Sequence, residues 1–397
     1  MIQHAAIVPL IGGLPLGSEL AFGSKPKYVL SYSPFKANDS QYLAYHNHSF
    51  PYHVIDENKV PPLPKVDVVG ATCPCAGLSS LSPSASSQNE ANDWMPTSAE
   101  FVLSRVRPKV FWGENAPRLA SKMGEPIVKK LREIGEANGY TLSLYKTKSL
   151  LHGLSQVRDR SFYFFWREKD RVPVLSFFNR EHERIEDTIR ASHFDEKDPM
   201  SIVPNKGMPS QQAFYRYVLE EMFGGISHVD FQRMITRSTN PMVFLEGRGI
   251  LYRDVATWMK KNGYDKVAAR CEKIHEKLSA GQNIMRKDVE IPKDKIGAFV
   301  GHLPMMLTHP DLDRFITIRE ALDIMKMPKD FILQGGAKNL NVICQNVPVT
   351  TARDMANEIS KYLNGELDMM NTRFLVQDNR ARTFSSESIP ASLEQFI

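Results

Sequence analysis

The first part of the chain alternates short apolar runs with helical patterns, and this alternation constrains the fold more than any other feature. We predict strands in five stretches: "AAIVPLIGG", "KYVLSYS", "PYHVID", "KVDVVGATC" and "PKVFWGENAP". Helical patterns lie among them in "LPLGSELAFG", "TSAEFVLSRV" and "GEPIVKKLREIGEANGY", and "RSFYFFW" predicts a late aromatic strand. Strands that alternate with helices are typical of an α/β fold with a doubly wound, mostly parallel sheet.

Residue types that commonly bind ligands or take part in catalysis lie where these predicted strands end. They are Gly12-Gly13, Asp56, Pro74-Cys75 and Glu114-Asn115. In a doubly wound sheet, ligands bind at the carboxyl ends of the strands. The sequence therefore predicts a functional site at this edge.

The pattern changes near residue 170. Residues 171–312 carry scattered charges and irregular spacing, apart from a helical hairpin pattern over 254–278 in which Cys271 falls on the apolar face. After residue 314, "RFITIREALDIMKMPKDF" and "TTARDMANEISKYLNGEL" predict strong amphipathic helices. We expect an α/β domain over 1–170, an inserted smaller domain over 171–312, and over 313–397 the end of the insert and a return to the first domain.

Composition excludes several classes of protein. With 397 residues, 42% hydrophobic and 24% charged, the chain is typical of a soluble globular protein of two domains. It shows neither a membrane-span pattern nor a signal-peptide pattern. Four cysteines make no disulfide framework at this length, so we expect a cytoplasmic location. The net charge of +5 permits a polyanionic partner without requiring one.

The stretch "ATCPCAGLSS" places two of the four cysteines at a predicted strand end. A thiolate is a strong nucleophile, and a neighbouring proline stiffens the backbone that positions it. Two buried structural cysteines would explain the stretch equally well. A metal site is disfavoured, because no other His or Cys lies at a familiar ligand spacing, and we expect no metal.

Two further motifs are ambiguous when each is taken alone. Glu114 in "WGENAP" fits an acid whose pKa burial would raise, or a helix cap. Gln156, Arg158 and Arg160 alternate in "QVRDR", so both arginines would project from one face of an extended segment. That pair suits a phosphate or a base carbonyl, or else a surface ion-pair ladder.

In combination and in this order, "PC", "EN" and "QxRxR" resemble the motifs of the cytosine-5 DNA methyltransferase family. The resemblance continues in "RFITIREALDIMKMPKDFILQGG" and "ICQNVPVTTARDMANEI", and it covers about 1–165 and 311–365. "PCAGLS" and "ENAP" look like the phage branch. The resemblance implies a methyltransferase fold in which the insert recognises the target sequence in double-stranded DNA. It also implies that the protein acts as a monomer in the cytoplasm of a bacterial or phage-infected cell.

The resemblance also implies roles for individual residues. Cys75 would attack carbon 6 of a flipped-out cytosine, and a methyl group from S-adenosylmethionine would reach carbon 5. The catalytic residues would be Cys75, Glu114, Arg158 and Arg160. Cofactor-binding residues would be Val8, Ile11, Gly12, Gly13, Ser33, Asp56, Pro74, Asn346 and Val347. DNA-contacting residues would be Ser79, Asn115, Gln156, Arg314 and Thr317. Contacts from the 79–91 loop and the inserted domain would supply the cost of extruding the base, and Cys73 is expected to be structural. Within that loop the serine-rich, polar segment 83–91 is predicted from its composition to be mobile.

The cofactor motifs depart from the family pattern. Val8 stands where the family has an aromatic residue, Leu10 stands for its first glycine, and no acidic residue follows the second strand before Asp39. Three alternatives to plain methyl transfer therefore stay open. They are transfer of a carboxymethyl or other modified group, read by Lys36, Gln345 or Asn346; a catalytically weak DNA-binding homologue; and a transfer-RNA-modifying relative, which the length of the insert disfavours.

Overall fold

The computed structural model describes residues 1–57, 59–79, 82, 84–192, 194–284, 286, 288–301 and 303–380, and it divides into two compact units. Unit 1 comprises Met1–His182, Met325–Gln334 and the described part of Val342–Ile397. Unit 2 comprises Glu183–Ile324 and Gly335–Asn341. The chain thus leaves unit 1 after residue 182 and returns at 325, compared with the sequence-based boundaries of 170 and 313.

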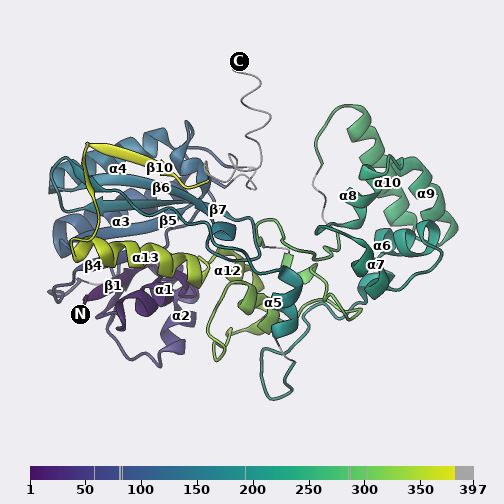
Figure 1. Ribbon diagram of the computed structural model, residues 1–397, viewed down its shortest axis with the longest axis horizontal. Helices are drawn as coiled ribbons and strands as arrows, with labels where there is room; N and C mark the ends of the chain where they lie inside the picture. The colour runs from purple at the N-terminus through teal and green to yellow at the C-terminus, as the bar shows by residue number, and fades with distance from the viewer. Residues whose placement is uncertain are drawn as a thin grey trace. The chain divides into compact units, whose positions relative to one another are not determined.

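An eight-stranded mixed sheet forms the centre of unit 1 (Figure 1). Its order is β10-β6-β7-β5-β4-β1-β2-β3, and only β7 runs antiparallel to its neighbours. The strands are β1 (His4–Ile7), β2 (Val29–Ser31), β3 (Tyr52–Val54), β4 (Val68–Ala71), β5 (Val110–Asn115), β6 (Thr141–Lys148), β7 (Asp159–Trp166) and β10 (Phe374–Asp378). A separate antiparallel pair joins β8 (Arg171–Pro173) to β9 (Met369–Asn371). The predicted doubly wound, mostly parallel fold is confirmed.

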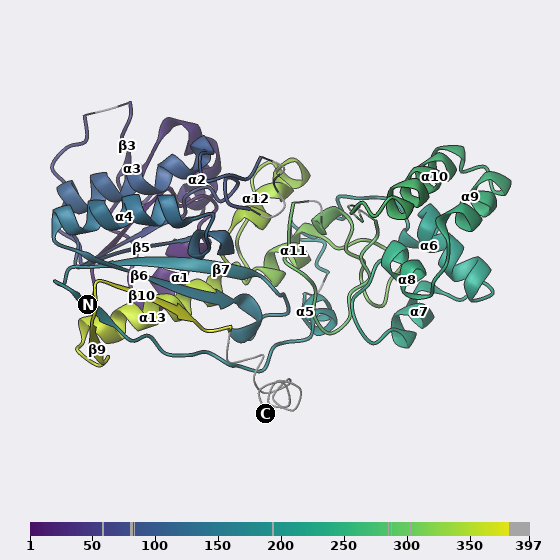
Figure 2. The same cartoon turned by 90° about the horizontal axis from the view of Figure 1, so that it is seen from above.

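Helices cover both faces of this sheet (Figure 2). On one face lie α3 (Trp94–Phe101) and α4 (Glu125–Asn138), and on the other α1 (Gly13–Phe22) packs against α13 (Val349–Leu363). Separate apolar clusters fill the two faces. Because both faces are buried, the central strands consist of continuous apolar runs, which made them predictable.

Not every element was predicted. Helix α2 (Lys36–Tyr45), strand β6 and the edge strand β10 were missed. The helix expected over 314–331 is shorter, because α11 spans only Ile318–Ile324. Residues 80, 81 and 83, in or beside the predicted mobile loop, lie outside the described residues.

Unit 2 is built mainly of helices with isolated β-bridges between its loops. They are α5 (Ile185–Ala191), α6 (Ala213–Tyr217), α7 (His228–Met234), α8 (Pro241–Gly247), α9 (Tyr252–Lys261), α10 (Asp265–Ser279) and α11. The predicted hairpin corresponds to α9 and α10, and Cys271 lies fully buried in the core of the unit, as expected. The short helix α12 (Leu340–Gln345) lies where the chain re-enters unit 1. No helix among the described residues is long and apolar enough to cross a membrane.

Candidate active site

Cys75 lies just beyond the carboxyl end of β4, in a turn closed by a 3.1 Å hydrogen bond from the Leu78 amide to the Cys75 carbonyl. Of the four cysteines, all of them in the described part of the chain, only Cys75 is partly exposed. The Asn115 side-chain amide, at the end of the adjacent strand β5, donates to the Pro74 carbonyl at 3.2 Å. Neighbouring parallel strands therefore hold the Pro74-Cys75 backbone from the side.

Cys73 occupies a different environment two residues earlier. Its thiol is buried and donates to the Trp94 carbonyl at 3.6 Å, and the Tyr163 hydroxyl donates to its sulfur at 3.9 Å. Burial raises the pKa of the Cys73 thiol to about 11. A thiol that stays protonated inside the core is a packing group, as the sequence analysis expected.

A buried ion pair lies at the same edge of the sheet. Glu114, in β5, is only 2% exposed, and its Oε1 pairs with Nε of Arg160. Arg160 reaches it because β7 is antiparallel to β5, so that the start of β7 lies beside the end of β5. The sequence predicted that Glu114 lies at a strand end, but the position of Arg160 beside it depends on the direction of β7.

Arg158 connects this edge to a distant segment of sequence. Its guanidinium donates to the carbonyls of Cys344, at 2.8 Å, and Asn346, at 3.0 Å. Burial, followed by the neighbouring charge of Arg160, lowers the pKa of Arg158 to about 10, so it remains cationic at neutral pH. Arg158 thus fixes the 344–346 backbone, a contact that the alternation in "QVRDR" did not reveal.

The glycine turn packs closely on that same segment. The Gly13 amide donates to Oδ1 of Asn346 at 2.8 Å. A Cβ atom at Gly13 would lie 1.9 Å from the Val347 carbonyl oxygen, so this first residue of α1 cannot carry a side chain without a shift of the backbone. Gly12, at φ of 106°, has the left-handed conformation that favours glycine.

The turn before these glycines is strained. Val8 and Leu10 adopt φ values of 51° and 53°, a region that costs non-glycine residues about 1–2 kcal/mol each. The buried carboxylate of Asp39 accepts the Leu10 amide at 3.0 Å and the Tyr52 hydroxyl at 3.1 Å. Burial raises the pKa of Asp39 to about 7. This role of Asp39 was not predicted, because α2, the helix that carries it, was not predicted.

The ends of β2 and β3 place two side-chain pairs side by side. Oδ1 of Asp56 accepts from the Ser33 amide at 2.8 Å and from its hydroxyl at 2.9 Å. Nζ of Lys36 pairs with Glu57 at 2.9 Å. Ser33, one of the residues that follow the second strand where the resemblance implies an acid, is therefore bound to the exposed Asp56 that follows β3.

The residues predicted to contact DNA divide between the two units. In unit 1, Ser79 is half-buried just after the Cys75 turn, and Gln156 is buried with its amide donating to the Met325 sulfur at 3.3 Å. In unit 2, Arg314 pairs with Glu320 at 2.7 Å. The Thr317 hydroxyl accepts the Glu320 amide while Glu320 accepts the Thr317 amide, which is a capping box at the start of α11.

The sheet with its covering helices defines the fold of S-adenosylmethionine-dependent methyltransferases. Two solved structures share it. One is assigned as a DNA modification methyltransferase encoded within an E. coli prophage, with a TM-score of 0.54 and 16% identity over 92% of this chain and 100% of that one. The other is the methyltransferase EhMeth of Entamoeba histolytica, with a TM-score of 0.52 and 11% identity over 91% of this chain and 99% of that one.

The family itself follows from the sequence comparison. A model of the C-5 cytosine-specific DNA methylase family matches residues 11–361. The chain belongs to this family of methyltransferases, as the order of its motifs indicated. No match was found among curated protein sequences.

Proposed function

We propose that the protein is a DNA cytosine-5 methyltransferase that uses S-adenosylmethionine and acts on double-stranded DNA. The observation that carries this proposal is the common position of two groups at the carboxyl edge of the sheet. One is the half-buried Cys75, and the other is the buried pair of Glu114 and Arg160. A nucleophile beside a preorganised acid is what addition to an aromatic base requires.

The Cys75 thiolate would form a bond to carbon 6 of an extruded cytosine. Glu114 would hydrogen-bond the exocyclic amine and the adjacent ring nitrogen, which promotes the addition and makes carbon 5 nucleophilic. Arg160 would keep Glu114 oriented and contact the base carbonyl, and Asn115 would hold the backbone that carries the thiol. After the methyl group reaches carbon 5, a base would remove the proton there and Cys75 would leave. Extruding the base costs a few kcal/mol, which contacts to the DNA must supply.

The residues present fit S-adenosylmethionine, which would supply an electrophilic methyl group when bound. Asp56 uses Oδ1 for Ser33, whereas its Oδ2 has no hydrogen-bond partner among the described residues and could accept an adenine amine. The turn at Gly12 and Gly13 leads into the amino end of α1, whose backbone amides favour a carboxylate. The segment at Asn346 and Val347 closes on this turn.

The geometry favours the plain donor over a carboxylated one. The charge of Lys36 is compensated by Glu57. The Asn346 side chain is engaged at both ends, with Oδ1 on the Gly13 amide and Nδ2 on the Met327 sulfur at 3.2 Å. Of the three side chains proposed to read an extra carboxylate, only Gln345 is exposed without such a contact.

Mass spectrometry tests the reaction directly. DNA from cells that express the protein is digested to nucleosides, and the mass of the modified cytosine identifies the transferred group. We expect 5-methylcytosine. A carboxymethyl adduct would replace the plain donor with a modified one, and unmodified DNA together with absent binding of radiolabelled S-adenosylmethionine would favour a DNA-binding homologue.

A further inference from the structure

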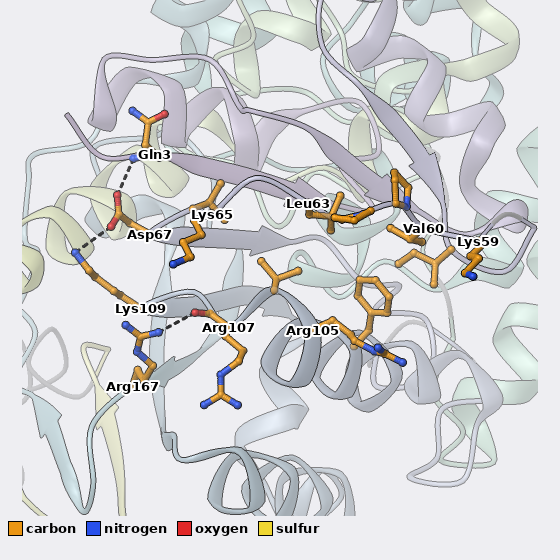
Figure 3. Close-up of a pocket in the computed structure, with 16 residues that line it drawn as sticks. Gln3, Lys59, Val60, Leu63, Lys65, Asp67, Arg105, Arg107, Lys109 and Arg167 are labelled. Atoms are coloured by element: carbon orange, nitrogen blue, oxygen red, sulfur yellow. Dashed lines mark hydrogen bonds and ion pairs between the residues drawn. The ribbon is translucent and has the colours of Figure 1, made fainter.

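A basic pocket lies at the opposite edge of the sheet, where the parallel strands begin (Figure 3). Lys65 and Asp67 precede β4, Lys109 precedes β5, and Arg167 follows the antiparallel strand β7. The pocket has a volume of about 1260 Å³. All residues that line it belong to unit 1, and none belongs to the candidate active site.

The charge of this pocket is one-sided. Six basic side chains line it against a single acidic one, in a chain whose total excess is only five. The basic residues are Lys59, Lys65, Arg105, Arg107, Lys109 and Arg167, all of them exposed. Asp67 compensates Lys109 at 3.0 Å, and the Arg167 guanidinium donates to the Arg107 carbonyl at 2.9 Å.

Four of these cations have no compensating group. The side chains of Lys59, Lys65, Arg105 and Arg107 form no ion pair with any residue in the described part of the chain. A neighbouring acidic group would reduce the attraction of such a cation for a polyanion. These four exposed cations can therefore attract a polyanion from solution.

The spread of the cations along the pocket favours one class of ligand. A single phosphate is bound by donors that converge on one point, but Figure 3 shows the cations spread from Lys109 and Arg167 at one end to Lys59 at the other. The lining also contains apolar residues, among them Val60, Leu63 and Phe101. An extended row of exposed cations matches a ligand with regularly spaced negative charge, as on a nucleic-acid backbone.

We infer that this pocket is a second DNA-binding surface, which holds the phosphate backbone of a DNA segment other than the one at Cys75. The inference rests on the proposed function in that DNA is taken as the polyanion. Binding at the pocket is independent of sequence and weakens with salt, because it consists of phosphate contacts. The chain would thereby hold two DNA segments at opposite edges of one sheet.

The first test measures stoichiometry with the full chain and a short fluorescent duplex at low salt, by sedimentation. The wild type should bind two duplexes, the second with a steep dependence on salt. In Lys59→Gln/Lys65→Gln, the slope of log affinity against log salt for the second duplex should fall by about 2, since each lost phosphate contact removes about 0.9. The matched control, Lys25→Gln/Lys129→Gln, removes two exposed lysines outside the pocket and should leave it unchanged. A wild type that binds one duplex at all salt concentrations overturns the inference.

The second test uses the wild-type chain and needs no variant. Amine acylation followed by mass spectrometry should show Lys59 and Lys65 protected by the duplex, with Lys25 and Lys129 still reactive. Protection by inorganic phosphate alone, or by phosphatidylserine vesicles but not by the duplex, overturns the assignment to DNA. Protected lysines in a chain that makes no methylcytosine would refute the proposed function and leave this site standing, and unprotected lysines in an active enzyme would do the reverse.

Discussion

The two edges of the central sheet of unit 1 use charge in opposite ways. At the carboxyl edge the charged groups are buried and paired, with Glu114 on Arg160 and Arg158 on backbone carbonyls. At the amino edge, Lys59, Lys65 and their neighbours are exposed and largely unpaired. A buried, fixed charge can orient a reacting group, whereas an exposed one attracts a polyanion without positioning it closely. The two edges of one sheet are thus suited to different tasks: the carboxyl edge to orienting a reacting group, and the amino edge to attracting a polyanion.

The largest effect should come from Cys75→Ala. Without the thiolate no adduct can form at carbon 6, so the rate of product formation should fall by at least about a thousandfold, while DNA binding at either edge persists. Single-turnover assays and duplex binding measure the two quantities. Cys73→Ala is the matched control and should stay active, and DNA containing 5-fluorocytosine should trap the wild type covalently. Product from Cys75→Ala above trace levels would contradict the assignment of the nucleophile.

Next in size is Glu114→Gln, which removes the charge that pairs with Arg160 and the group proposed to bind the base. The rate of methyl transfer should fall by about a hundredfold to ten-thousandfold, the usual range for a lost acid–base group. Breaking a buried pair also lowers the free energy of unfolding by about 3–5 kcal/mol, so thermal unfolding must be measured alongside. The amino-edge variant Lys59→Gln/Lys65→Gln should change neither quantity. Equal losses of rate and stability in both variants would contradict the proposed difference between the two edges.

A third substitution tests how tightly the carboxyl edge is assembled. Gly13→Ala introduces a methyl group where the Val347 carbonyl oxygen leaves no room. We expect the free energy of unfolding to fall by about 1–3 kcal/mol, the cost of overpacking, and the affinity for S-adenosylmethionine to fall with it. Calorimetry and cofactor titration report the two effects. Gly247→Ala, at a glycine with open space around it, serves as the control and should be nearly neutral.

The sequence predicted best what depends on local pattern. The apolar runs of β1, β4 and β5 and the motif at their ends placed Cys75, Glu114 and Asn115 at one edge. It predicted poorly what depends on distant contacts. That Arg158 would bind carbonyls 186 and 188 residues away follows only from the return of the chain to unit 1. The edge strand β10 has partly exposed residues and so lacks the continuous apolar pattern of the central strands.

The pocket at the amino edge was missed for a related reason. Its cations come from the segment 59–65, the turn at 105–109 and the end of β7, and only the turn, with Arg105, Arg107 and Lys109, is a local run of basic residues. The sequence offered only a net charge of +5, which is too small to locate a surface. Sheet topology brings the three segments together at the start of β4 and β5.

The effect that depends most on conditions should be the change of stability with pH that Asp39 contributes at the carboxyl edge. Its pKa is about 7 in the folded chain, above the ordinary value of 3.8, because burial disfavours the charged carboxylate. Between these two values the folded state binds more protons at this site than the unfolded state does. The contribution of Asp39 to stability is therefore fully present below about pH 4 and is lost as the pH rises to about 7.

The variant Asp39→Asn can still accept the Leu10 amide but cannot ionise, so its stability should not fall over this pH range on account of residue 39. Free energies of unfolding measured against pH for the two chains should diverge from pH 4 upward, with the variant gaining on the wild type up to about pH 7 and the difference constant beyond. The exposed lysines of the amino edge make the natural control, because Lys59→Gln/Lys65→Gln should shift the curve without changing its slope over this range. Parallel curves for the wild type and Asp39→Asn would mean that Asp39 is charged in the folded chain, and that the left-handed turn at Leu10 is held by an ionised carboxylate.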